Sequence, residues 1–456
     1  MTRFSLAHSS PGSLPARSAR AALAAAACVV AVAPAAKAQD LMAMNRAGRW
    51  AEVIPAAETL LRDPALSPVR ACETYAELIH AAIHAGQVEK AGEAVRAFDA
   101  RCAAFPESAW FRREVRAMAE RLRSTGGTAA VRPPRGPVGA GGGWRVGDAA
   151  ALGLDTAALA RHRGVCERSG ADACLVAYRG RIVQEWYGPE YAYPMATMSS
   201  VKSWTGLLVG LLIADGRIGS VDDPVARYLP EWRAGAERGV TLRHLLTMTS
   251  GLRRRRGQGS GDEMVGATRD KNALVLSLPL DRAPGERWEY SNEGAQLLSP
   301  LLERAAGEPL QRYAAERLFG PLEMDSTSLR LDGAGHAWTY ADARTTLRDF
   351  AKICQLALDG GRWNGRQVVP EAWIRASLTP SPRNASYGFL WWLGTEPRVY
   401  ATRGYLDTDC EAYPEWGLVV ARMQRRPRSD AQHYRTPETT RLLAEVVRHA
   451  LPPSRP

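Results

Sequence analysis

The chain has 456 residues, of which 46% are hydrophobic and 23% are charged. These values are ordinary for a globular protein, and they exclude a disordered, collagen-like or multi-span membrane protein. The length favours two or three domains. Arginine carries nearly all of the positive charge, because lysine occurs only at positions 37, 90, 202, 271 and 352. Since a buried lysine can act as a base and an arginine cannot, each lysine is a candidate for chemistry.

The net charge of +11 is concentrated at the two ends of the chain. Residues 1–38 carry four basic residues and no acidic one, and residues 422–456 carry eight arginines against three acidic residues. Residues 39–421 have a net charge of only +2. A nucleic-acid-binding protein more often spreads a basic face through its fold, so we predict no nucleic-acid partner. The four arginines at 253–256 stand alone in a Gly-rich segment.

Residues 1–38 have the three parts of a secretory signal peptide. Arginines precede the apolar run 21–33, and Ala36-Lys37-Ala38 offers a cleavage site of small residues. A run of 13 residues is too short to span a bilayer. We therefore expect export to the periplasm or beyond the cell, and no membrane span after the signal is removed. The alternative is a low-complexity Ala-rich tail.

Six cysteines follow the signal. Exported proteins reach oxidising compartments where disulfides form. Pairing of sequence neighbours would join 72 with 102, 166 with 174, and 354 with 410, although other connectivities and buried free thiols remain open. His80 and His84 lie four residues apart on an expected helix, but without a third ligand nearby they are ordinary helix residues. We predict no metal site and no cofactor.

Apolar residues recur at spacings of three and four between residues 39 and 123, which predicts a helical domain. The segments 47–52 and 85–91 each begin with Ala-Gly, and their glycines are 38 residues apart. The domain loosely resembles tetratricopeptide repeats, whose period is about 34 residues. It would bind a protein partner or pack on the next domain, and a plain helical bundle is the alternative. Residues 124–147 are rich in Gly, Pro and Arg, and we expect a linker there.

Residues 148–456 are expected to form one large α+β domain. Strands over 175–178 and 181–187 with Gly180 between them predict a hairpin, and further strands are expected at 387–393, 399–401 and 417–423. Helices are expected at 199–215, 243–248, 295–306, 347–358 and 437–448. Strands at both ends of a helical middle favour an antiparallel sheet that brings the first and last strands together.

Only one lysine follows a serine by three residues, in Ser199-Ser200-Val201-Lys202. Residues i and i+3 share a helix face, so the Ser199 hydroxyl and the Lys202 amine would be neighbours. A serine hydroxyl needs an adjacent base to become a good nucleophile, and a lysine becomes that base where burial or nearby cations disfavour its charge. The apolar flanks favour burial. The alternative is a helix-capping serine followed by a surface lysine.

Two later segments carry further candidates. Tyr290-Ser291-Asn292 follows a Pro-Gly turn, and residues two apart in such a backbone face the same side. Tyrosine can relay a proton, and asparagine can hold a substrate carbonyl or amide, although such a pair is usually an ordinary polar pair in a loop. Arg403-Gly404-Tyr405 follows the expected strand 399–401. A glycine there lets a substrate backbone approach, and the next amide could donate to an oxyanion.

These three motifs, in this order, resemble the serine β-lactamase and penicillin-binding protein superfamily. Flanking segments that match the class C β-lactamase-like branch lie at 211–216, 222–225, 241–252, 283–285 and 321–325. The resemblance covers about residues 148–450, and the Trp-rich and Gly-rich pattern is similar to 6-aminohexanoate-dimer hydrolases and related carboxylesterases. It implies an antiparallel sheet covered by a helical subdomain, with the site in the cleft between them.

The resemblance also implies a role for each matched residue. Ser199 would be the nucleophile, Lys202 its base, Tyr290 the proton relay and Asn292 a substrate contact. The backbone N–H groups of Ser199 and Tyr405 would form the oxyanion hole.

The third motif departs from the usual pattern of Lys or His, then Thr or Ser, then Gly. Here Thr402 and Arg403 precede Gly404, and Asp407 and Thr408 stand where many relatives carry Gly-Gln. Arg403 could meet a substrate carboxylate in place of the usual basic residue, but strand alternation would put its side chain on the opposite face. This departure argues against β-lactam and D-Ala-D-Ala substrates and leaves the nucleophile and its base intact.

We therefore predict an exported serine hydrolase that cleaves an amide or ester of a small acyl substrate through a covalent acyl-enzyme. A β-lactamase or a penicillin-binding DD-peptidase is the alternative within the superfamily. A catalytically silent binding protein, using residues 39–123 to contact a partner, is the alternative from another class.

Overall fold

A computed structural model describes residues 41, 44, 49–66, 68–85, 87–102, 142–188, 191, 194–253, 269–425 and 432–450. The predicted signal peptide, most of the predicted linker and the arginines at 254–256 lie outside the described residues. The side chains of His80 and His84 are also outside them, so the structure does not test their assignment.

Three helices form most of the described part of residues 39–123: α2 (Trp50–Leu61), α3 (Pro68–His84) and α4 (Val88–Arg101). Their apolar faces share a core that includes Ile54, Ile79 and Phe98. The disulfide Cys72–Cys102 joins α3 to the residue that follows α4, as pairing of neighbours predicted. The described residues of this part are largely helical, and an all-α domain over 39–123 that resembles tetratricopeptide repeats stays a prediction.

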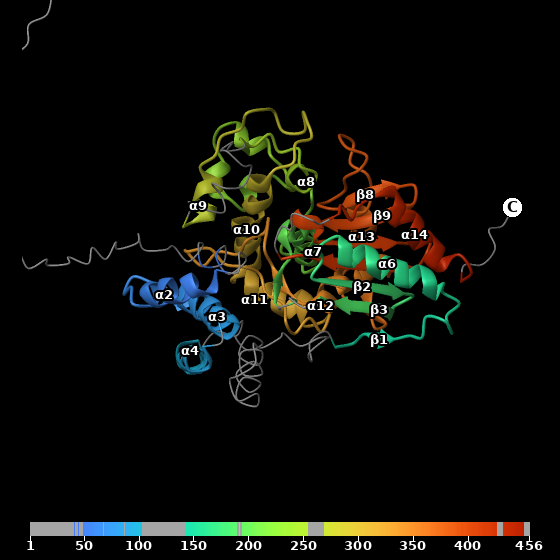
Figure 1. Ribbon diagram of the computed structural model, residues 1–456. Coiled ribbons are helices and arrows are strands. Elements are labelled where there is room, and N and C mark those ends of the chain that lie inside the picture. The colour runs from blue at the N-terminus through green and yellow to red at the C-terminus, as the bar shows by residue number, and fades with distance from the viewer. Residues whose placement is uncertain are drawn as a thin grey trace, which may run out of the picture. The chain divides into compact units, whose positions relative to one another are not determined.

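Within the described residues, the second domain is built on seven strands in the order β1-β3-β2-β11-β10-β9-β8 (Figure 1). The strands are β1 (Arg145–Val146), β2 (Ala173–Tyr178), β3 (Arg181–Tyr187), β8 (Trp392–Thr395), β9 (Arg398–Arg403), β10 (Asp409–Tyr413) and β11 (Leu418–Met423). Every pair is antiparallel except β1 with β3. The predicted hairpin is confirmed as β2 and β3, and the predicted meeting of the first and last strands as β2 beside β11.

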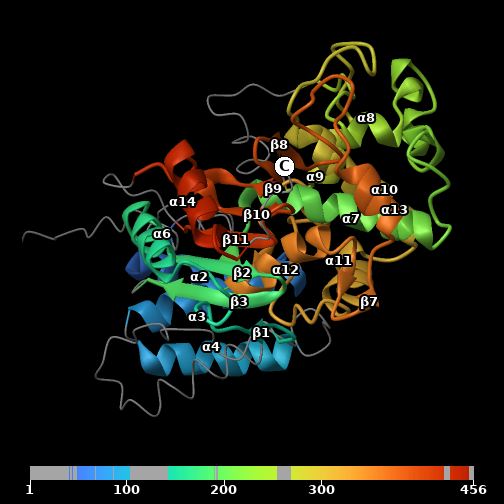
Figure 2. The same ribbon diagram turned by 90° about the vertical axis from the view of Figure 1, so that its right-hand side faces the viewer.

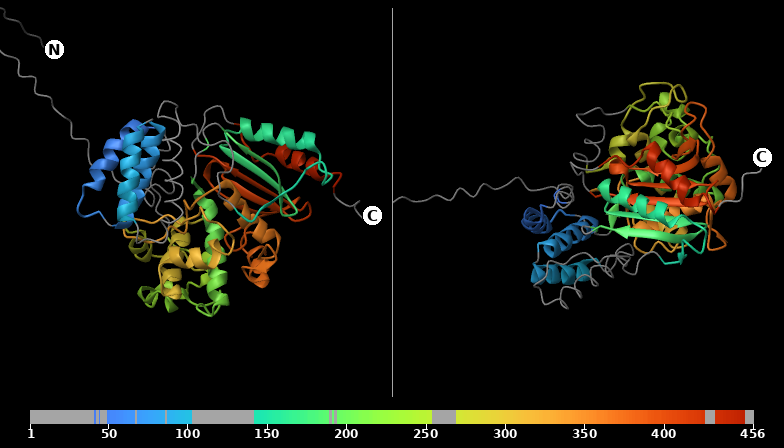
Figure 3. Two further views of the ribbon diagram at one scale, coloured as in Figure 1. Left: turned by 90° about the horizontal axis from the view of Figure 1, so that it is seen from below. Right: turned by 45° about the vertical axis from the view of Figure 1, so that its right-hand side comes forward.

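Helices cover both faces of this sheet. On one face α6 (Thr156–Arg168) and α14 (Pro437–Val447) pack together, and on the other lies α12 (Leu347–Leu358) (Figures 2 and 3). Alternate residues of β2 point to opposite faces of the sheet. Val176 packs in the hydrophobic core on the side of α6 and α14, whereas Leu175 and Ala177 pack in the core on the side of α12. Because both faces are covered, β2 and β11 are buried throughout, and Arg422 is the one charged residue in either strand.

The remaining elements lie between β3 and β8 in the chain or follow β9. The α-helices are α7 (Val201–Ala214), α8 (Leu242–Leu246), α9 (Lys271–Leu276), α10 (Asn292–Ala306), α11 (Leu310–Ala314) and α13 (Glu371–Ser377). The 3₁₀ and π turns are Met198–Ser200, Val225–Arg227, Pro230–Trp232, Ala236–Gly239, Ala315–Phe319 and Tyr405–Asp407. Short strand pairs are β4 (Met195–Ala196) with β5 (Arg344–Thr345), and β6 (Arg362–Trp363) with β7 (Arg366–Gln367).

Two sequence predictions about this domain are wrong. The segment 387–393 is not one strand, because Leu390 adopts a left-handed backbone (φ 62°) and the strand begins only at Trp392. The aromatic residues that favoured a strand there, such as Tyr387 and Trp391, are instead buried in the core. The predicted linker also extends too far, because residues 145–146 form β1 of the sheet. In the part of the chain that the structure describes, no helix combines the length and apolar character needed to cross a membrane.

Candidate active site

Ser199 lies at the junction between β4 and α7, in a backbone held from several sides. The Thr197 N–H donates to Ala343 O at 2.8 Å, and the Ser200 hydroxyl donates to Thr408 O at 2.7 Å. Met198, directly before the candidate nucleophile, has a left-handed backbone with φ of 51°. A non-glycine residue keeps such a conformation only when its surroundings enforce it, and conformations of this kind cluster at functional sites.

Lys202 lies one helical turn after Ser199, on the same face of the helical segment. Its Nζ atom donates to Ser199 Oγ at 3.1 Å and to Tyr340 O at 2.6 Å, and the residue is only 2% exposed. The burial and the pairing predicted from Ser-x-x-Lys are both present. Tyr340 lies in a loop 138 residues further along, and nothing in the sequence pointed to it.

The ring of Tyr290 closes the other side of Lys202. The Nζ atom of Lys202 lies 4.9 Å from the centre of this ring, and Trp392 stacks on the ring at 5.9 Å. The Ser291 side chain caps α10 by accepting the Gly294 N–H at 2.9 Å, which holds Tyr290 just before the helix begins.

Gly404 brings the end of β9 against the Ser199 segment. A Cβ atom at this position would lie 2.7 Å from Thr197 O and 2.9 Å from both Met198 Cβ and Thr408 O, closer than such atoms approach. Only glycine therefore fits without displacing backbone. Its N–H donates to the buried carboxylate of Asp409 at 3.0 Å, which ties the end of β9 to the start of β10.

A cavity of about 240 Å³ opens beside the candidate nucleophile. Its wall is formed by Ser199, Tyr290, Trp392, Arg403, Gly404, Tyr405 and Arg435. Of the predicted substrate-contacting residues, Asn292 lies outside this wall, as the first residue of α10. Among the described residues, the buried Oδ1 atom of Asn292 has no hydrogen-bond partner.

Two arginines in the wall are held by carboxylates. Arg403 lies 3.5 Å from Glu411 Oε1, and Arg435 lies 2.7 Å from Asp407 Oδ1 and 3.3 Å from Asp409 Oδ2. Burial raises the pKa of Asp409 to about 7, while the neighbouring Arg435 opposes that rise. Arg403, the last residue of β9, belongs to the cavity wall, and the expectation about the direction of its side chain stays a prediction.

A second, larger cavity of about 510 Å³ lies between α9 and α10 and is lined by Glu303 and His336, among other residues. The hydrogen bond to Glu303 raises the pKa of His336. Its described lining contains no serine, threonine, cysteine or lysine, so it lacks the nucleophile and base found at Ser199.

Sequence comparison decides the family. The profile described as Beta-lactamase matches residues 157–445, well over half of the chain. The chain belongs to the beta-lactamase family. The match spans all three motifs. The beta-lactamase-like fold with its covering helices agrees with what the sequence resemblance implied.

Relatives within the family are named as hydrolases. The 6-aminohexanoate-dimer hydrolase of Paenarthrobacter ureafaciens is 24% identical over 59% of this chain and 76% of its own length. Esterase EstB of Burkholderia gladioli is 34% identical over 53% of this chain and 70% of its own. A Bacillus anthracis structure provisionally named 6-aminohexanoate-dimer hydrolase shares the fold, with a TM-score of 0.56 at 20% identity over 64% of this chain and 82% of that chain. This beta-lactamase family member is a serine hydrolase.

Sequence reasoning missed three residues of this family member's site. Tyr340 contributes a backbone oxygen and Trp392 a ring, and neither belongs to a recognisable motif. Arg435 was counted with the basic C-terminal stretch, yet it lines the cavity beside Ser199. Its separation in sequence from the three motifs left no local signal that could have placed it there.

Proposed function

We propose that this family member cleaves an amide or ester of a small acyl substrate through a covalent acyl-enzyme formed on Ser199. The observation that carries the proposal is the pairing of Ser199 with Lys202, whose amine is buried and lies 3.1 Å from the hydroxyl oxygen. A serine with an adjacent base is the arrangement that nucleophilic catalysis requires.

The first half-reaction follows from these positions. Lys202 accepts the hydroxyl proton while Ser199 Oγ bonds to the substrate carbonyl carbon, giving a tetrahedral oxyanion. The backbone N–H groups of Ser199 and Tyr405 stabilise this oxyanion. Tyr290 gives its proton to the leaving amine or alcohol as the bond to it breaks and takes the proton held by Lys202 in return, so Lys202 is again a free base. Water then attacks the acyl-enzyme, and the proton transfers run in reverse.

The substrate class is an open-chain amide or ester. The third motif lacks its usual first basic residue, since the buried Thr402 stands there, so the contact that lactamases make to a substrate carboxylate is altered. Relatives named as an amide-dimer hydrolase and an esterase agree with this choice. Arg403 and Gly404 would line the path of the substrate, whereas Asn292, which lies outside the cavity wall, would contact only a part of the substrate that extends beyond it.

We also propose export. The signal-like residues 1–38 point to it, and the two disulfides in the described residues agree with an oxidising compartment. We propose in addition that residues 39–123 contact a protein partner, since the described helices there have no residue in the cavity that contains Ser199.

A panel of chromogenic substrates tests the function. Purified protein is given p-nitrophenyl esters, short p-nitroanilide amides and a chromogenic cephalosporin, beside Ser199→Ala and the control Ser277→Ala, which changes an exposed serine at the end of α9. We expect turnover of esters or amides by wild type and the control, and none by Ser199→Ala. Turnover of the cephalosporin above the esters would favour the β-lactamase alternative.

A fluorophosphonate probe separates an enzyme from a silent binding protein. The probe should label wild type and the Ser277 control, and mass spectrometry should place the label on Ser199. A folded wild type that takes no label would overturn the proposed function.

A further inference from the structure

Tyr405 presents its ring at the rim of the cavity that contains Ser199. Of the described residues, only Val146 and Tyr405 are large hydrophobic side chains that are exposed, and Tyr405 is 68% exposed. A single exposed ring needs no explanation on an ordinary surface. Here Tyr405 belongs to a cavity wall that also contains Tyr290 and Trp392, which stack on each other, so three of the lining residues are aromatic.

The turn that carries Tyr405 has an unusual backbone. Leu406 and Asp407 follow with φ angles of 63° and 52°, so two consecutive residues other than glycine are left-handed. Such conformations persist only where surrounding contacts enforce them. The turn Tyr405–Asp407 is therefore held in place, which fixes the position of the Tyr405 backbone in the cavity wall.

Arg422 supplies the contacts that hold this backbone. Its guanidinium donates to Leu406 O at 2.6 Å and to Asp407 O at 2.9 Å. The same group donates to Ser169 Oγ at 3.0 Å and to Ser169 O at 2.6 Å. Arg422 is itself 1% exposed, so these bonds lie in the interior, where an unpaired donor would be costly.

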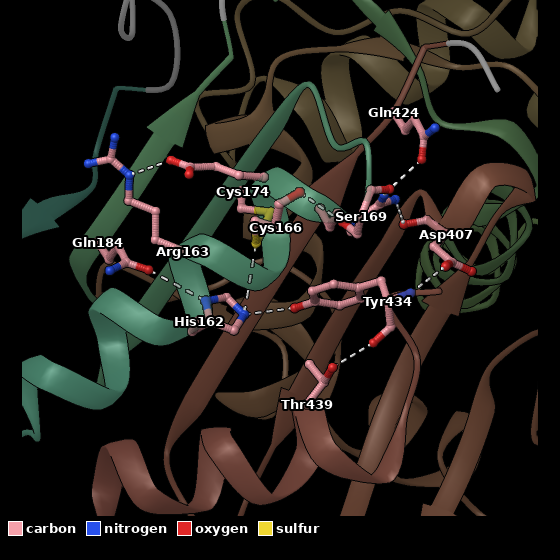
Figure 4. Close-up of a disulfide and its surroundings, with 12 residues drawn as sticks. His162, Arg163, Cys166, Ser169, Cys174, Gln184, Asp407, Gln424, Tyr434 and Thr439 are labelled. Carbon is pink, nitrogen blue, oxygen red and sulfur yellow. Dashed lines mark hydrogen bonds and ion pairs between the residues drawn. A yellow bond between two sulfur atoms is a disulfide. The ribbon is translucent and has the colours of Figure 1, made fainter. Parts of the chain in front are cut away.

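The Ser169 end of this network is anchored by a disulfide. Ser169 follows the last turn of α6, and Cys166 in that turn is bonded to Cys174 of β2. Figure 4 shows Ser169 beside this disulfide, with Asp407 bonded to the backbone of Tyr434. The turn that carries Tyr405 is thus tied to α6 and the sheet, and a rim fixed in this way binds a ligand at less cost in entropy.

We propose that Tyr405 is a specificity-determining residue whose ring stacks on an aromatic group of the substrate, in the cavity whose wall also contains Tyr290 and Trp392. The substrate class is then an aryl-bearing ester or amide. This inference rests on the proposed function. The inference concerns only the side chain of Tyr405, because Tyr405→Ala and Tyr405→Phe both keep the backbone N–H that would form the oxyanion hole.

Four esters test the inference. Each combines an acetyl or phenylacetyl group with ethanol or phenol, and its hydrolysis is monitored by the release of acid in a pH-stat. Wild type, Tyr405→Ala and Tyr405→Phe are compared at equal concentrations of fluorophosphonate-titrated sites, which corrects for misfolded protein. We expect wild type to prefer an aryl group on one side of the scissile bond. Tyr405→Ala should reduce that aryl-to-alkyl ratio of kcat/KM about tenfold, and Tyr405→Phe should retain it.

Two results would overturn the inference. The first is an aryl-to-alkyl ratio of kcat/KM that agrees within about twofold between wild type and Tyr405→Ala on both sides of the scissile bond. The second is a fall in this ratio that is as large in Tyr405→Phe as in Tyr405→Ala, because that would assign the preference to the hydroxyl group. Failure of wild type to hydrolyse any ester while Ser199 still takes the probe would refute the proposed ester chemistry as well. The two failures are therefore distinguishable.

Discussion

The Nζ atom of Lys202 lies 3.1 Å from the Oγ atom of Ser199. The same spacing of three residues places Lys352 Nζ 3.0 Å from Asp349 Oδ1. Both lysines are buried, with Lys202 2% and Lys352 0% exposed. One lysine therefore faces a hydroxyl in a cavity wall and the other a carboxylate in the core, and their substitutions should have opposite consequences.

Lys202→Met should remove activity and keep the fold. Methionine fills a similar volume, and removing a buried amine that pairs only with neutral groups relieves a desolvation cost. We expect kcat to fall by roughly a hundred- to ten-thousandfold, the usual contribution of a general base. Ester hydrolysis and thermal unfolding are measured on the same preparation. If Lys202→Met keeps more than a tenth of wild-type kcat, Lys202 is not the general base.

Lys352→Met should weaken the fold and keep the activity. The substitution leaves Asp349 buried without its cation, and breaking a buried ion pair on one side costs about 3–5 kcal/mol. Urea unfolding at neutral pH measures this loss, and kcat/KM below the unfolding transition serves as the control. Equal losses of kcat in the Lys352 and Lys202 variants would show that burial, and not the serine contact, decides the effect.

Gly404→Ala should impair both stability and turnover. The added methyl would push against Thr197 O and Met198 Cβ, so β9 and the Ser199 segment must separate. We expect a loss of about 1–3 kcal/mol from overpacking and roughly a hundredfold fall in kcat from misplaced reacting groups. The matched control is Gly239→Ala, where the nearest atom lies 3.9 Å away. Equal behaviour of the two variants would argue against a close-approach role for Gly404.

The pKa of Asp409 makes stability depend on pH. Burial raises this pKa from 3.8 to about 7, so the folded protein holds the proton more tightly than the unfolded chain. The resulting contribution to the unfolding free energy is fully present below about pH 4 and is lost as the pH rises through 7, and it amounts to at most about 4 kcal/mol. Asp409→Asn stays neutral and lacks this loss.

Urea unfolding from pH 5 to pH 8 checks this dependence. The stability of Asp409→Asn relative to wild type should increase from pH 5 to about pH 7 and level off above it, whatever the offset between the two proteins at pH 5. Parallel curves would show that Asp409 titrates near its ordinary value in the folded protein. Asp359→Asn is a useful comparison, because burial also raises the pKa of Asp359, at a position far from the cavity wall.

The thiol content should distinguish two disulfides from three. Cys166–Cys174 and Cys72–Cys102 are bonded, whereas Cys354 and Cys410 are buried free thiols, so the third pair expected from the sequence is not formed. Burial raises the pKa of Cys354 and lowers its reactivity. Unreduced protein lacking residues 1–38 should show no reactive thiol with Ellman's reagent when native and two when denatured. If the denatured protein shows no reactive thiol, Cys354 and Cys410 are bonded to each other and the third disulfide predicted from the sequence is present.

Local patterns were sufficient for several elements. Helix α12 spans Leu347–Leu358, the range predicted from its spacing, and the turn before β3 follows from Arg179 and Gly180, whose left-handed backbones suit a tight hairpin. The proximity of Ser199 and Lys202 belongs to the same class, because i and i+3 lie on one helix face whatever the rest of the chain does. The prediction of one strand over 387–393 is wrong, because the aromatic residues of this segment pack in the core without forming a continuous strand.

The scarcity of lysine was informative and incomplete. Of the four lysines that the structure describes, three are buried, and Lys271 and Lys352 are as enclosed as Lys202. The residue three positions earlier distinguishes them, and that residue can be read from the sequence. From the sequence, the arginines of residues 422–456 were counted only toward the charge of that end of the chain. Two of them belong to the fold, since Arg422 is 1% exposed and Arg435 lines the cavity.

The sequence by itself determined the family, the order of the motifs and the candidate nucleophile with its base, because each depends on residues a few positions apart. Only the tertiary structure decided what surrounds them. Tyr340 reaches Lys202 across 138 residues, and Arg422 joins Ser169 to the Tyr405 turn across 253. Such contacts exist only after distant strands and helices pack, and that packing depends on the burial of the whole core and not on any short spacing in the chain.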